Sequence, residues 1–410
     1  MRFVSGKRFV LAAISLAFVL TACGSSQRES NSVSSEVRSS YRLGHFPVVP
    51  TGRLSAATGA KLQAALDAAL KDQRLPSVTT TVLVAGRGAW SGAAGTADGT
   101  HPVVARSEYG IGSISKMVIA AEIMRLADQG KLRLSDPVSE HLPPWFHFDA
   151  KGVTIKDLLS LTAGIPDPKA PRGTNPVMAH PLHHWTLEQV LSFVPAHRDK
   201  PGAHWFYGES NYILLALVVR HTTGTSVAAA LRQHILANPR LASLVYQTDE
   251  RPKRPLALPS IDGKIRSDVL KIGGGYLPTA AEASVANGAG GMASDAPALA
   301  LFGYELFGRH LVSERSLKAM TTWKTGDHDP FGLGVFNDTR TQTGTFNTYA
   351  VGYGGEVPGG YSSGLVVFPK KGIAISALTN TTGGPGDKLD PLVQKIALIV
   401  ARIKATPLAK

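Results

Sequence analysis

Hydrophobic and polar residues follow two different periods along this chain, and each change of period marks an element of a mixed fold. Residues 56–74 carry apolar side chains at helical spacing, and Pro76 limits that helix. Residues 78–84 are mostly β-branched, residues 86–88 are Gly-Arg-Gly, and residues 89–94 can form the second strand of a hairpin. The folded part is therefore predicted to begin with a helix and two antiparallel strands.

Helical patterns dominate the middle of the chain, and strand patterns return near its end. Capping-box layouts at Thr154 and Thr186 each open a predicted helix. Two strands are predicted at residues 365–368 and 373–379. The last element, residues 389–404, is an amphipathic helix that we expect to pack on the sheet beside the first helix.

The first 22 residues have the layout of a secretory signal peptide. Three basic residues precede an apolar run, Phe9 to Leu20, that is too short for a comfortable membrane span. Leu-Thr-Ala-Cys then resembles a bacterial lipobox, in which Cys23, the only cysteine of the chain, is lipidated and becomes the mature N-terminus. The alternative is an ordinary signal peptide that happens to contain cysteine. We expect an exported protein, anchored by lipid at the extracytoplasmic face of the cell membrane.

Residues 23–53 form a predicted Ser- and Pro-rich tether, with eight serines among residues 24–40. Such a composition cannot bury a core and stays solvated. Taken as a whole, the chain has 43% hydrophobic and 18% charged residues, which is the composition of a globular protein. The folded domain is therefore expected to stand off the membrane.

The formal net charge is +13, or +10 once the three basic residues of the leader are subtracted. A basic exported protein suits anionic lipid heads or acidic envelope polymers, although the charge can equally serve solubility alone. We expect no nucleic-acid partner, because the sequence contains no recognisable nucleic-acid-binding module.

Ser113 and Lys116 stand at the start of an apolar, Ala-rich run that ends at Gly130. The run predicts a helix, and residues three apart on a helix share one face, so the hydroxyl can lie beside the amine. A serine next to a base is a candidate nucleophile, and the helix N-terminus adds positive potential where an oxyanion would form. The alternative is a chance Ser-x-x-Lys pair on a solvated helix.

The wider sequence around this pair resembles a known family. Residues 109–116, followed by residues 129–138, resemble the penicillin-recognising serine hydrolases, which include class C β-lactamases, DD-carboxypeptidases and related esterases. The resemblance extends over about residues 56–402. It favours a catalytic role for Ser113 and Lys116 over a chance occurrence of the Ser-x-x-Lys pair.

The resemblance implies an α+β fold, an α/β sandwich built on an antiparallel sheet flanked by helices from both chain ends. A single domain at 54–405 would consist of an α/β part, residues 54–112 and 286–405, and a mostly helical insert, residues 113–285. The active site would lie where the two parts meet, since clefts are expected at such junctions.

The second motif of the family is Pro-Gly, four residues, then Tyr-x-Asn, and its spacing places the tyrosine at Tyr207. The resemblance implies that this phenol moves a proton between the nucleophile and the leaving group. Glu209 occupies the asparagine position, and Asn211 lies two residues further on. An ionised glutamate only accepts hydrogen bonds, and its charge would hold Lys116 protonated and shift the proton-transfer role towards Tyr207.

The third motif of the family, Lys-Thr-Gly or His-x-Gly, corresponds to Tyr353, Gly354 and Gly355. Tyrosine brings no charge, so a substrate carboxylate would be held more weakly. Glycines on this strand would let a substrate backbone pair with its edge. The resemblance also implies an oxyanion hole made by the backbone N–H groups of Ser113 and Glu356.

A segment rich in Pro and Gly spans residues 166–181, and three histidines, His180, His183 and His184, lie at its end and just after it. No carboxylate or cysteine accompanies them at ligand spacing, so we interpret the segment as a surface loop near the site entrance. Neither a metal nor a cofactor is expected.

These observations predict a lipid-anchored serine hydrolase of the cell envelope that forms an acyl-enzyme on Ser113. The substitutions at Glu209 and Tyr353 favour an esterase or an atypical peptidase or amidase over an efficient β-lactamase. The substrate would be a small ester or a peptide related to peptidoglycan. The alternative is a catalytically degenerate envelope protein that binds peptidoglycan or lipid-linked ligands in the same cleft.

Overall fold

The computed structural model describes the greater part of the chain after the predicted tether. The described residues are 46, 48–150, 152–169, 180–196, 199–261, 264–266, 280–323, 330–338, 349–358, 360–382, 389–401 and 403. The predicted signal peptide, the lipidated Cys23 and most of the predicted tether lie outside the described residues, as do residues 170–179 of the predicted entrance loop.

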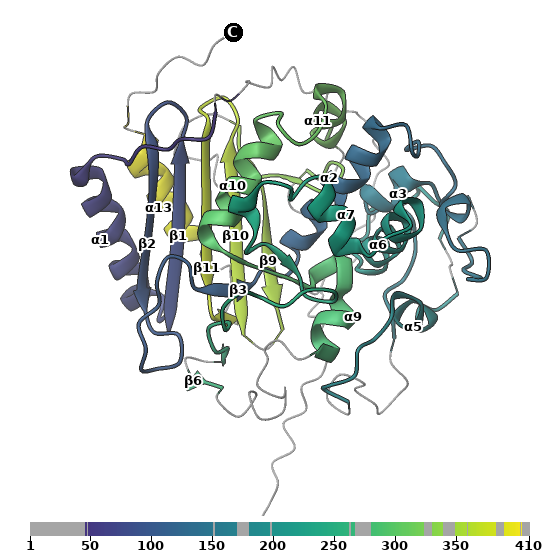
Figure 1. Cartoon of the computed structure of the whole chain (residues 1–410), viewed down its shortest axis with the longest axis horizontal. Helices are drawn as coiled ribbons and strands as arrows, with labels where there is room; N and C mark the ends of the chain where they lie inside the picture. The colour runs from purple at the N-terminus through teal and green to yellow at the C-terminus, as the bar shows by residue number, and fades with distance from the viewer. Residues whose placement is uncertain are drawn as a thin grey trace, which may run out of the picture.

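A six-stranded antiparallel sheet forms the centre of the fold (Figure 1). Its strands lie in the order β2-β1-β11-β10-β9-β8. Their bounds are β1 Ser77–Val84, β2 Gly88–Gly95, β8 Phe336–Asn337, β9 Val351–Val357, β10 Tyr361–Phe368 and β11 Ile373–Thr379. The two ends of the chain build this sheet together, because β1 pairs with β11 from Thr79↔Leu378 to Val84↔Ile373.

Helices cover both faces of the sheet. On one face, α1 (Ala56–Asp72) and α13 (Asp390–Ala401) share an apolar cluster that includes Leu62, Leu66 and Ile396, as predicted for the last helix. On the other face lies α10 (Ala296–Phe307), where the Ser376 hydroxyl of β11 donates to the Ala296 carbonyl at 2.7 Å. The predicted α+β fold with flanking helices is confirmed.

The remaining helices gather beside the sheet around α2 (Ile114–Asp128) (Figure 1). Twelve of the fifteen residues of α2 are buried, so this helix is enclosed on nearly all sides. The other helices are η1 Val138–His141, α3 Ile155–Leu159, α5 Leu187–Ser192, α6 Ser210–Thr223, α7 Val227–Gln233, η2 Pro239–Leu241, α9 Ala280–Gly290 and α11 Glu314–Met320.

Two small sheets complete the structure. Their strands are β3 Glu108–Gly110, β7 Met292–Asp295 and β4 Val245–Tyr246 in one, and β12 Thr381–Thr382, β5 Ser260–Ile261 and β6 Lys264–Ile265 in the other. In the part of the chain that the structure describes, no single helix has the length and hydropathy of a membrane span. The helices α6 and α7 have that length and hydropathy only when they are taken together, and they are bent by 70° relative to each other.

The capping boxes predicted at Thr154 and Thr186 are present at the starts of α3 and α5. The Ala-rich segment before residue 290 forms α9, because alanines favour helix there, and Asn287 kinks it with φ 44°. The edge strand β8 is short, and Phe331 forms an isolated bridge to Phe336.

Candidate active site

Ser113 and Lys116 meet at the first turn of α2, as predicted. Ser113 is the N-cap of the helix, and Lys116 Nζ donates a hydrogen bond to Ser113 Oγ at 3.1 Å. The Lys116 side chain is fully buried, whereas Ser113 is half-buried. A buried amine that touches a more accessible hydroxyl is the arrangement required of a base and its nucleophile.

The ammonium of Lys116 has a second partner on α9. Its Nζ donates to the carbonyl of Ala289 at 2.8 Å. This carbonyl follows the kink at Asn287, whose side-chain oxygen accepts from the Tyr246 hydroxyl and from the backbone N–H of Gly288. A strained backbone position two residues away therefore helps to fix the carbonyl that orients Lys116.

Strand β9 lies very close to Ser113. A Cβ on Gly355 would lie 2.1 Å from the carbonyl oxygen of Ile111 and 3.0 Å from the backbone nitrogen of Ser113. Gly112, with φ +50°, also has no room for a side chain, because a Cβ there would lie 2.7 Å from the backbone nitrogen of Glu356. Glycine at both positions brings the two predicted oxyanion donors, Ser113 and Glu356, onto adjacent backbone segments.

Tyr207 lies against Lys116 through its ring. The Lys116 nitrogen is 4.9 Å from the ring centroid, within the range of a cation–π contact. The hydroxyl of Tyr207 accepts a hydrogen bond from the Tyr353 hydroxyl at 3.3 Å. Among the described residues, that hydroxyl makes no hydrogen bond to Ser113 or Lys116. The predicted phenol is therefore beside the pair, but its oxygen is engaged with the third motif.

An aromatic cluster supports the two tyrosines. Phe336 stacks on Tyr207 with centroids 6.5 Å apart and meets Tyr353 edge-on at 5.0 Å. Phe331 contacts Trp205, Phe336 and Tyr353 with centroids 4.6 to 6.2 Å apart. Burial raises the pKa of Tyr353 well above its usual value, and the neighbouring Tyr207 adds to this effect. Tyr353 is therefore a neutral hydrogen-bond donor.

Glu209 shares its surroundings with a second carboxyl that the sequence did not single out, Asp167. Asp167 Oδ1 accepts the backbone N–H groups of Glu209, at 2.5 Å, and Ser210, at 3.2 Å, and so caps the start of α6. Burial raises the pKa of Glu209, and the charge of Lys116 opposes that shift while Asp167 adds to it. Burial also raises the pKa of Asp167, whereas the hydrogen bonds from the two backbone N–H groups lower it.

The neighbourhood of Glu209 bears on the expectation for that residue. Its carboxyl has no hydrogen bond to any described residue, whereas Asp167 accepts two from the start of a helix, where a negative charge is favoured. These two hydrogen bonds favour the ionised form of Asp167, and Glu209 has no such bonds in the described structure. Burial of Glu209 favours its neutral form and Lys116 favours its ionised form, so the expectation that an ionised Glu209 holds Lys116 charged stays a prediction.

The comparisons with known proteins agree with this site. The sequence model of the family described as Beta-lactamase matches residues 62–398. The chain belongs to the β-lactamase family. The hydrogen-bonded pair Ser113 and Lys116 thus lies on the fold that the family resemblance implied.

Among curated proteins, one related to this β-lactamase-family chain is described as a penicillin-binding protein, PbpX, of Bacillus subtilis (strain 168). It is 27% identical over 234 residues, which are 56% of this chain and 54% of PbpX. Protein flp of Staphylococcus aureus (strain MW2) is 29% identical over 145 residues, which are 32% of this chain and 26% of flp. The chain therefore spans about half of PbpX and about a quarter of flp.

Among solved structures, a D-stereospecific amidohydrolase from Streptomyces sp. is 25% identical with a TM-score of 0.66, and the match covers 84% of this chain and 98% of that one. A D-amino acid amidase from Ochrobactrum anthropi SV3 has a TM-score of 0.70 at 20% identity, with 84% and 98% covered. The second likeness concerns the β-lactamase-family fold alone.

Asn211, two residues beyond Glu209, does not replace the missing asparagine of the family motif. It is 2% exposed, and its Nδ2 donates to the Gly208 carbonyl at 3.2 Å. This contact lies within the turn that begins α6. Asn211 is therefore a structural residue of that turn.

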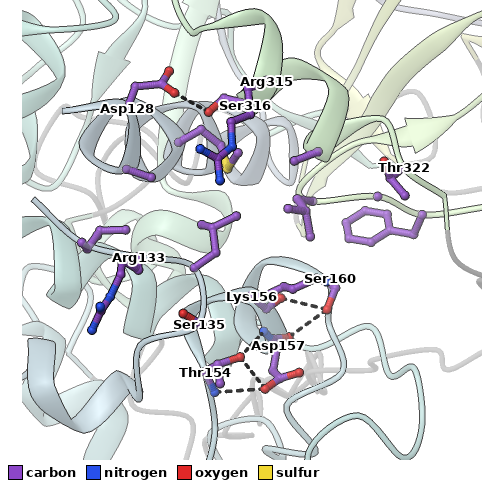
Figure 2. A pocket seen from close by; sticks show the side chains of 18 of the residues that line it. Asp128, Arg133, Ser135, Thr154, Lys156, Asp157, Ser160, Arg315, Ser316 and Thr322 are labelled. Atoms are coloured by element: carbon purple, nitrogen blue, oxygen red, sulfur yellow. Dashed lines mark hydrogen bonds between the residues drawn. The ribbon is translucent and has the colours of Figure 1, made fainter. Parts of the chain in front are cut away.

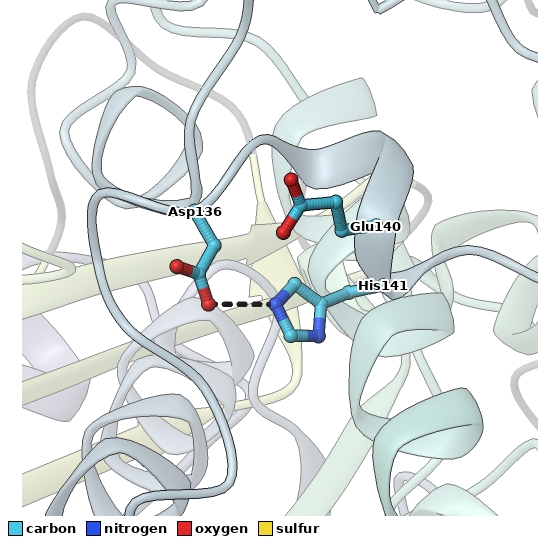
Figure 3. Close-up of side chains that lie close together, drawn as sticks. All are labelled: Asp136, Glu140 and His141. Carbon is cyan, nitrogen blue, oxygen red and sulfur yellow. Dashed lines mark hydrogen bonds and ion pairs between the residues drawn. The ribbon is translucent and has the colours of Figure 1, made fainter.

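Away from this site, three potential metal ligands, Asp136, Glu140 and His141, lie within 4.8 Å of one another (Figure 3). Asp136 already accepts three hydrogen bonds, from the backbone N–H and Nε of Arg133, both at 2.8 Å, and from His141 at 2.9 Å. These bonds lower the pKa of Asp136. Its carboxylate thereby ties the loop after α2 to η1, which explains the cluster without an ion.

Sequence reasoning missed Asp167, the Ala289 carbonyl and the aromatic cluster. Asp167 lies within the segment interpreted as an entrance loop, and no motif distinguishes its carboxyl from others. The Ala289 carbonyl is a backbone atom, which leaves no signature in side-chain patterns. Of the three histidines at the end of that segment and just after it, His184 has a clear structural role, because its ring bonds the Thr248 carbonyl at 2.8 Å.

Proposed function

We propose that this protein is a serine hydrolase of the cell envelope that forms an acyl-enzyme on Ser113. The observation that carries the proposal is the 3.1 Å hydrogen bond between Lys116 Nζ and Ser113 Oγ at the buried start of α2. Ser113 Oγ attacks the carbonyl carbon of an ester or amide, and Lys116 takes the hydroxyl proton. Water then releases the acyl group from Ser113.

Stabilisation of the tetrahedral oxyanion is assigned to the backbone N–H groups of Ser113 and Glu356. The close passage of β9 at Gly355 supports this role, because it brings the second donor next to the nucleophile. The hydroxyl of Tyr207 delivers the proton to the leaving group. Its hydrogen bond from Tyr353 supports this assignment, because the oxygen accepts from Tyr353 and keeps its own hydrogen for donation.

The proposed substrates are amides or esters whose recognition does not depend on a carboxylate. Tyr353 supplies a neutral hydroxyl where the family motif carries a cation, so the charge-assisted grip on a substrate carboxylate is absent at that position. The related Streptomyces protein is named a D-stereospecific amidohydrolase. Amides of D-amino acids are therefore the first substrate class to test, ahead of penicillins.

Glu209 acts in its protonated form in this proposal. A neutral carboxylic acid offers one donor and one acceptor, as does the asparagine side chain that the motif lacks here. The lack of any hydrogen bond from the Glu209 carboxyl to a described residue supports this role, since both of its oxygens stay available to a substrate. The neighbouring Asp167 keeps the negative charge at the start of α6.

The protein is further proposed to be exported and anchored through lipid on Cys23, with residues 23–53 as its tether. The support is the order of basic residues, apolar run and Leu-Thr-Ala-Cys in the sequence. Metabolic labelling with an alkyne fatty acid should mark the wild-type chain and leave Cys23→Ser unmarked. Equal labelling of both would contradict the anchor.

Intact-mass labelling tests the catalytic proposal. The purified domain is incubated with a fluorophosphonate and, separately, with a penicillin. Ser113→Ala serves as the test variant, and Ser139→Ala, at an exposed position, as the control. A fluorophosphonate adduct that disappears only in Ser113→Ala supports an activated serine. A penicillin adduct in addition would widen the substrate class towards peptidoglycan stems, whereas no adduct on folded protein would favour the degenerate, ligand-binding alternative.

A further inference from the structure

A groove of about 1020 Å³ opens beside the C-terminal half of α2 (Figure 2). One wall is formed by the end of α2 and by α11, and the opposite wall by residues 132–135 and α3. Met124, the first groove residue on α2, comes eleven residues after Ser113, which corresponds to about 16 Å along the helix axis. The groove is therefore separate from the catalytic serine.

Apolar side chains line much of this groove. They come from α2, the loop after it, α11 and the segment that follows: Met124, Leu132, Leu134, Ala319, Phe331 and Leu333. The volume is at the upper end of the range of about 300–1,000 Å³ that is usual for sites that bind small organic molecules. An apolar body of the size of a short peptide or a medium-length acyl chain would be accommodated.

Two cations belong to opposite walls of the groove. Arg315 of α11 points its guanidinium into the open space in Figure 2, and Lys156 of α3 lies on the facing wall. Both residues are exposed, and neither side chain has a hydrogen bond or ion pair with any described residue. The third cation, Arg133, is already paired with Asp136 at 2.8 Å. Arg315 and Lys156 therefore remain available to a ligand.

The two carboxylates of the groove are occupied within their own walls. Asp128 accepts from the backbone N–H of Ser313 and from the hydroxyls of Ser313 and Ser316, at 2.6 to 2.7 Å. Asp157 accepts from the backbone N–H and hydroxyl of Thr154, at 3.0 and 2.6 Å, in the capping box of α3. Neither carboxylate forms an ion pair with the facing cations in the described structure.

Trp323 contributes a buried hydrogen-bond donor to the groove. Trp323 lines the groove and is 3% exposed, and its indole N–H is buried without a hydrogen-bond partner among the described residues. An unsatisfied buried donor is costly, so an acceptor that reached it would be favoured. Arg315, Lys156 and the indole N–H of Trp323 thus offer donors to a ligand in this groove.

We propose that this groove is a second binding site, which takes an organic anion made of a carboxylate joined to an apolar body. Arg315, whose guanidinium points into the groove, binds the carboxylate, Lys156 adds positive charge from the facing wall, and the apolar walls cover the rest of the ligand. The complementarity is specific, because a neutral molecule of the same shape would leave both cations without a partner. A fatty acid and a peptide with a free C-terminal carboxylate share this chemistry.

Titration calorimetry on the Ser113→Ala protein tests the site and prevents turnover of the probes. The probes are decanoate, acetyl-Leu-Phe with a free carboxylate, and acetyl-Leu-Phe amide as the neutral match. We expect at least one carboxylate to bind with saturation, and the amide to bind at least tenfold more weakly than its acid. Which carboxylate binds identifies the source of the ligand.

Charge variants complete the test. Arg315→Gln and Lys156→Gln should each weaken binding about tenfold, equivalent to about 1.4 kcal/mol. Lys318→Gln, on the exposed side of the same helix as Arg315, should leave binding unchanged, and equal melting temperatures would show that all three variants fold. The proposal is overturned if neither carboxylate binds, or if the two groove variants bind as tightly as Lys318→Gln.

Discussion

The hydroxyl of Tyr353 donates a hydrogen bond to the hydroxyl of Tyr207 at 3.3 Å. Tyr353 departs from the third motif of the family, whereas Tyr207 matches the second motif. The two residues are thus in direct contact. Since burial raises the pKa of Tyr353, its phenol stays neutral and continues to donate. Tyr207 then retains its own hydrogen, which is the state that its proposed role as a proton donor requires.

This relationship predicts unequal effects for two Tyr→Phe substitutions. Tyr207→Phe removes the proposed proton donor and should lower kcat/KM for an amide at least 100-fold, the lower end of the effect of general acid–base groups, because the amine must be protonated as it leaves. Tyr353→Phe removes only a supporting hydrogen bond and should cost about tenfold. Steady-state kinetics on both variants measure the difference. Equal losses in the two would contradict the assignment of Tyr207 as the donor.

The close passage of β9 predicts that Gly355 tolerates no side chain. Gly355→Ala places a Cβ 2.1 Å from the Ile111 carbonyl oxygen, so the strand must move away from Ser113. We expect fluorophosphonate labelling to slow at least 100-fold, with a stability loss of about 1–3 kcal/mol from overpacking.

Gly364 on β10 is the matched control for that substitution. It pairs directly with Gly354, and a Cβ there would meet only the Val393 side chain, at an ordinary 3.8 Å. Gly364→Ala should therefore label at the wild-type rate. If Gly355→Ala also labelled at that rate, the backbone next to Ser113 would not be part of the oxyanion site.

The neutral form of Glu209 predicts a specific pH dependence. Burial raises the pKa of Glu209, so the acid stays protonated to higher pH than an exposed glutamate and loses its proton above that pKa. If the neutral form binds substrate, kcat/KM falls on the alkaline side of the raised pKa. Glu209→Gln, which is neutral at every pH, should keep activity and lose this alkaline limb.

The pH profiles of the wild type, Glu209→Gln and Glu140→Gln measure this effect. Glu140 is exposed and away from Ser113, so its variant should follow the wild-type profile. An alkaline limb that persists unchanged in Glu209→Gln would assign it to another group. Loss of activity at all pH values in that variant would show that the ionised carboxylate is the working form.

A buried pair between α2 and the end of α7 predicts a stability effect. His234 Nδ1 lies 2.5 Å from Glu122 Oε1, and the Glu122 side chain is fully buried. His234→Ala leaves this carboxyl unpaired and should lower the free energy of unfolding by about 3–5 kcal/mol at pH 7. His221→Ala, at an exposed histidine on α6, should change it little.

The pH dependence of that loss follows from the pKa of Glu122, which burial raises and His234 lowers. Without His234 the folded-state pKa rises further, so the folded state holds a proton that the unfolded state releases above about pH 4.5. The loss should therefore shrink as the pH falls towards 4. Urea denaturation at pH 4.5 and pH 7 measures it, and an equal loss at both would exclude ionised Glu122 as the cause.

The sequence sufficed for features that depend on local periodicity. The hairpin β1–β2, the capping boxes at Thr154 and Thr186 and the contact of Ser113 with Lys116 each involve residues close together in the chain. The helical repeat alone brings positions three apart onto one face. The family resemblance added the pairing of the two chain ends in one sheet, which no local pattern contains.

Other parts of the site required the packed structure. Tyr207 and Tyr353 are 146 positions apart, and their hydrogen bond exists because β9 and the segment before α6 share one aromatic cluster. The protonation of Glu209 depends on burial and on Asp167, 42 positions earlier.

The sequence by itself thus determined the candidate nucleophile, its neighbouring amine and the fold, because helical spacing and motif order fix them. Only the tertiary structure decided the burial of Glu209 beside Asp167, which atoms orient Lys116, and that Arg315 and Lys156 line one groove. The physical reason is that electrostatic environment and long-range contact arise from packing, and packing brings together residues whose separation in the chain carries no periodic signal.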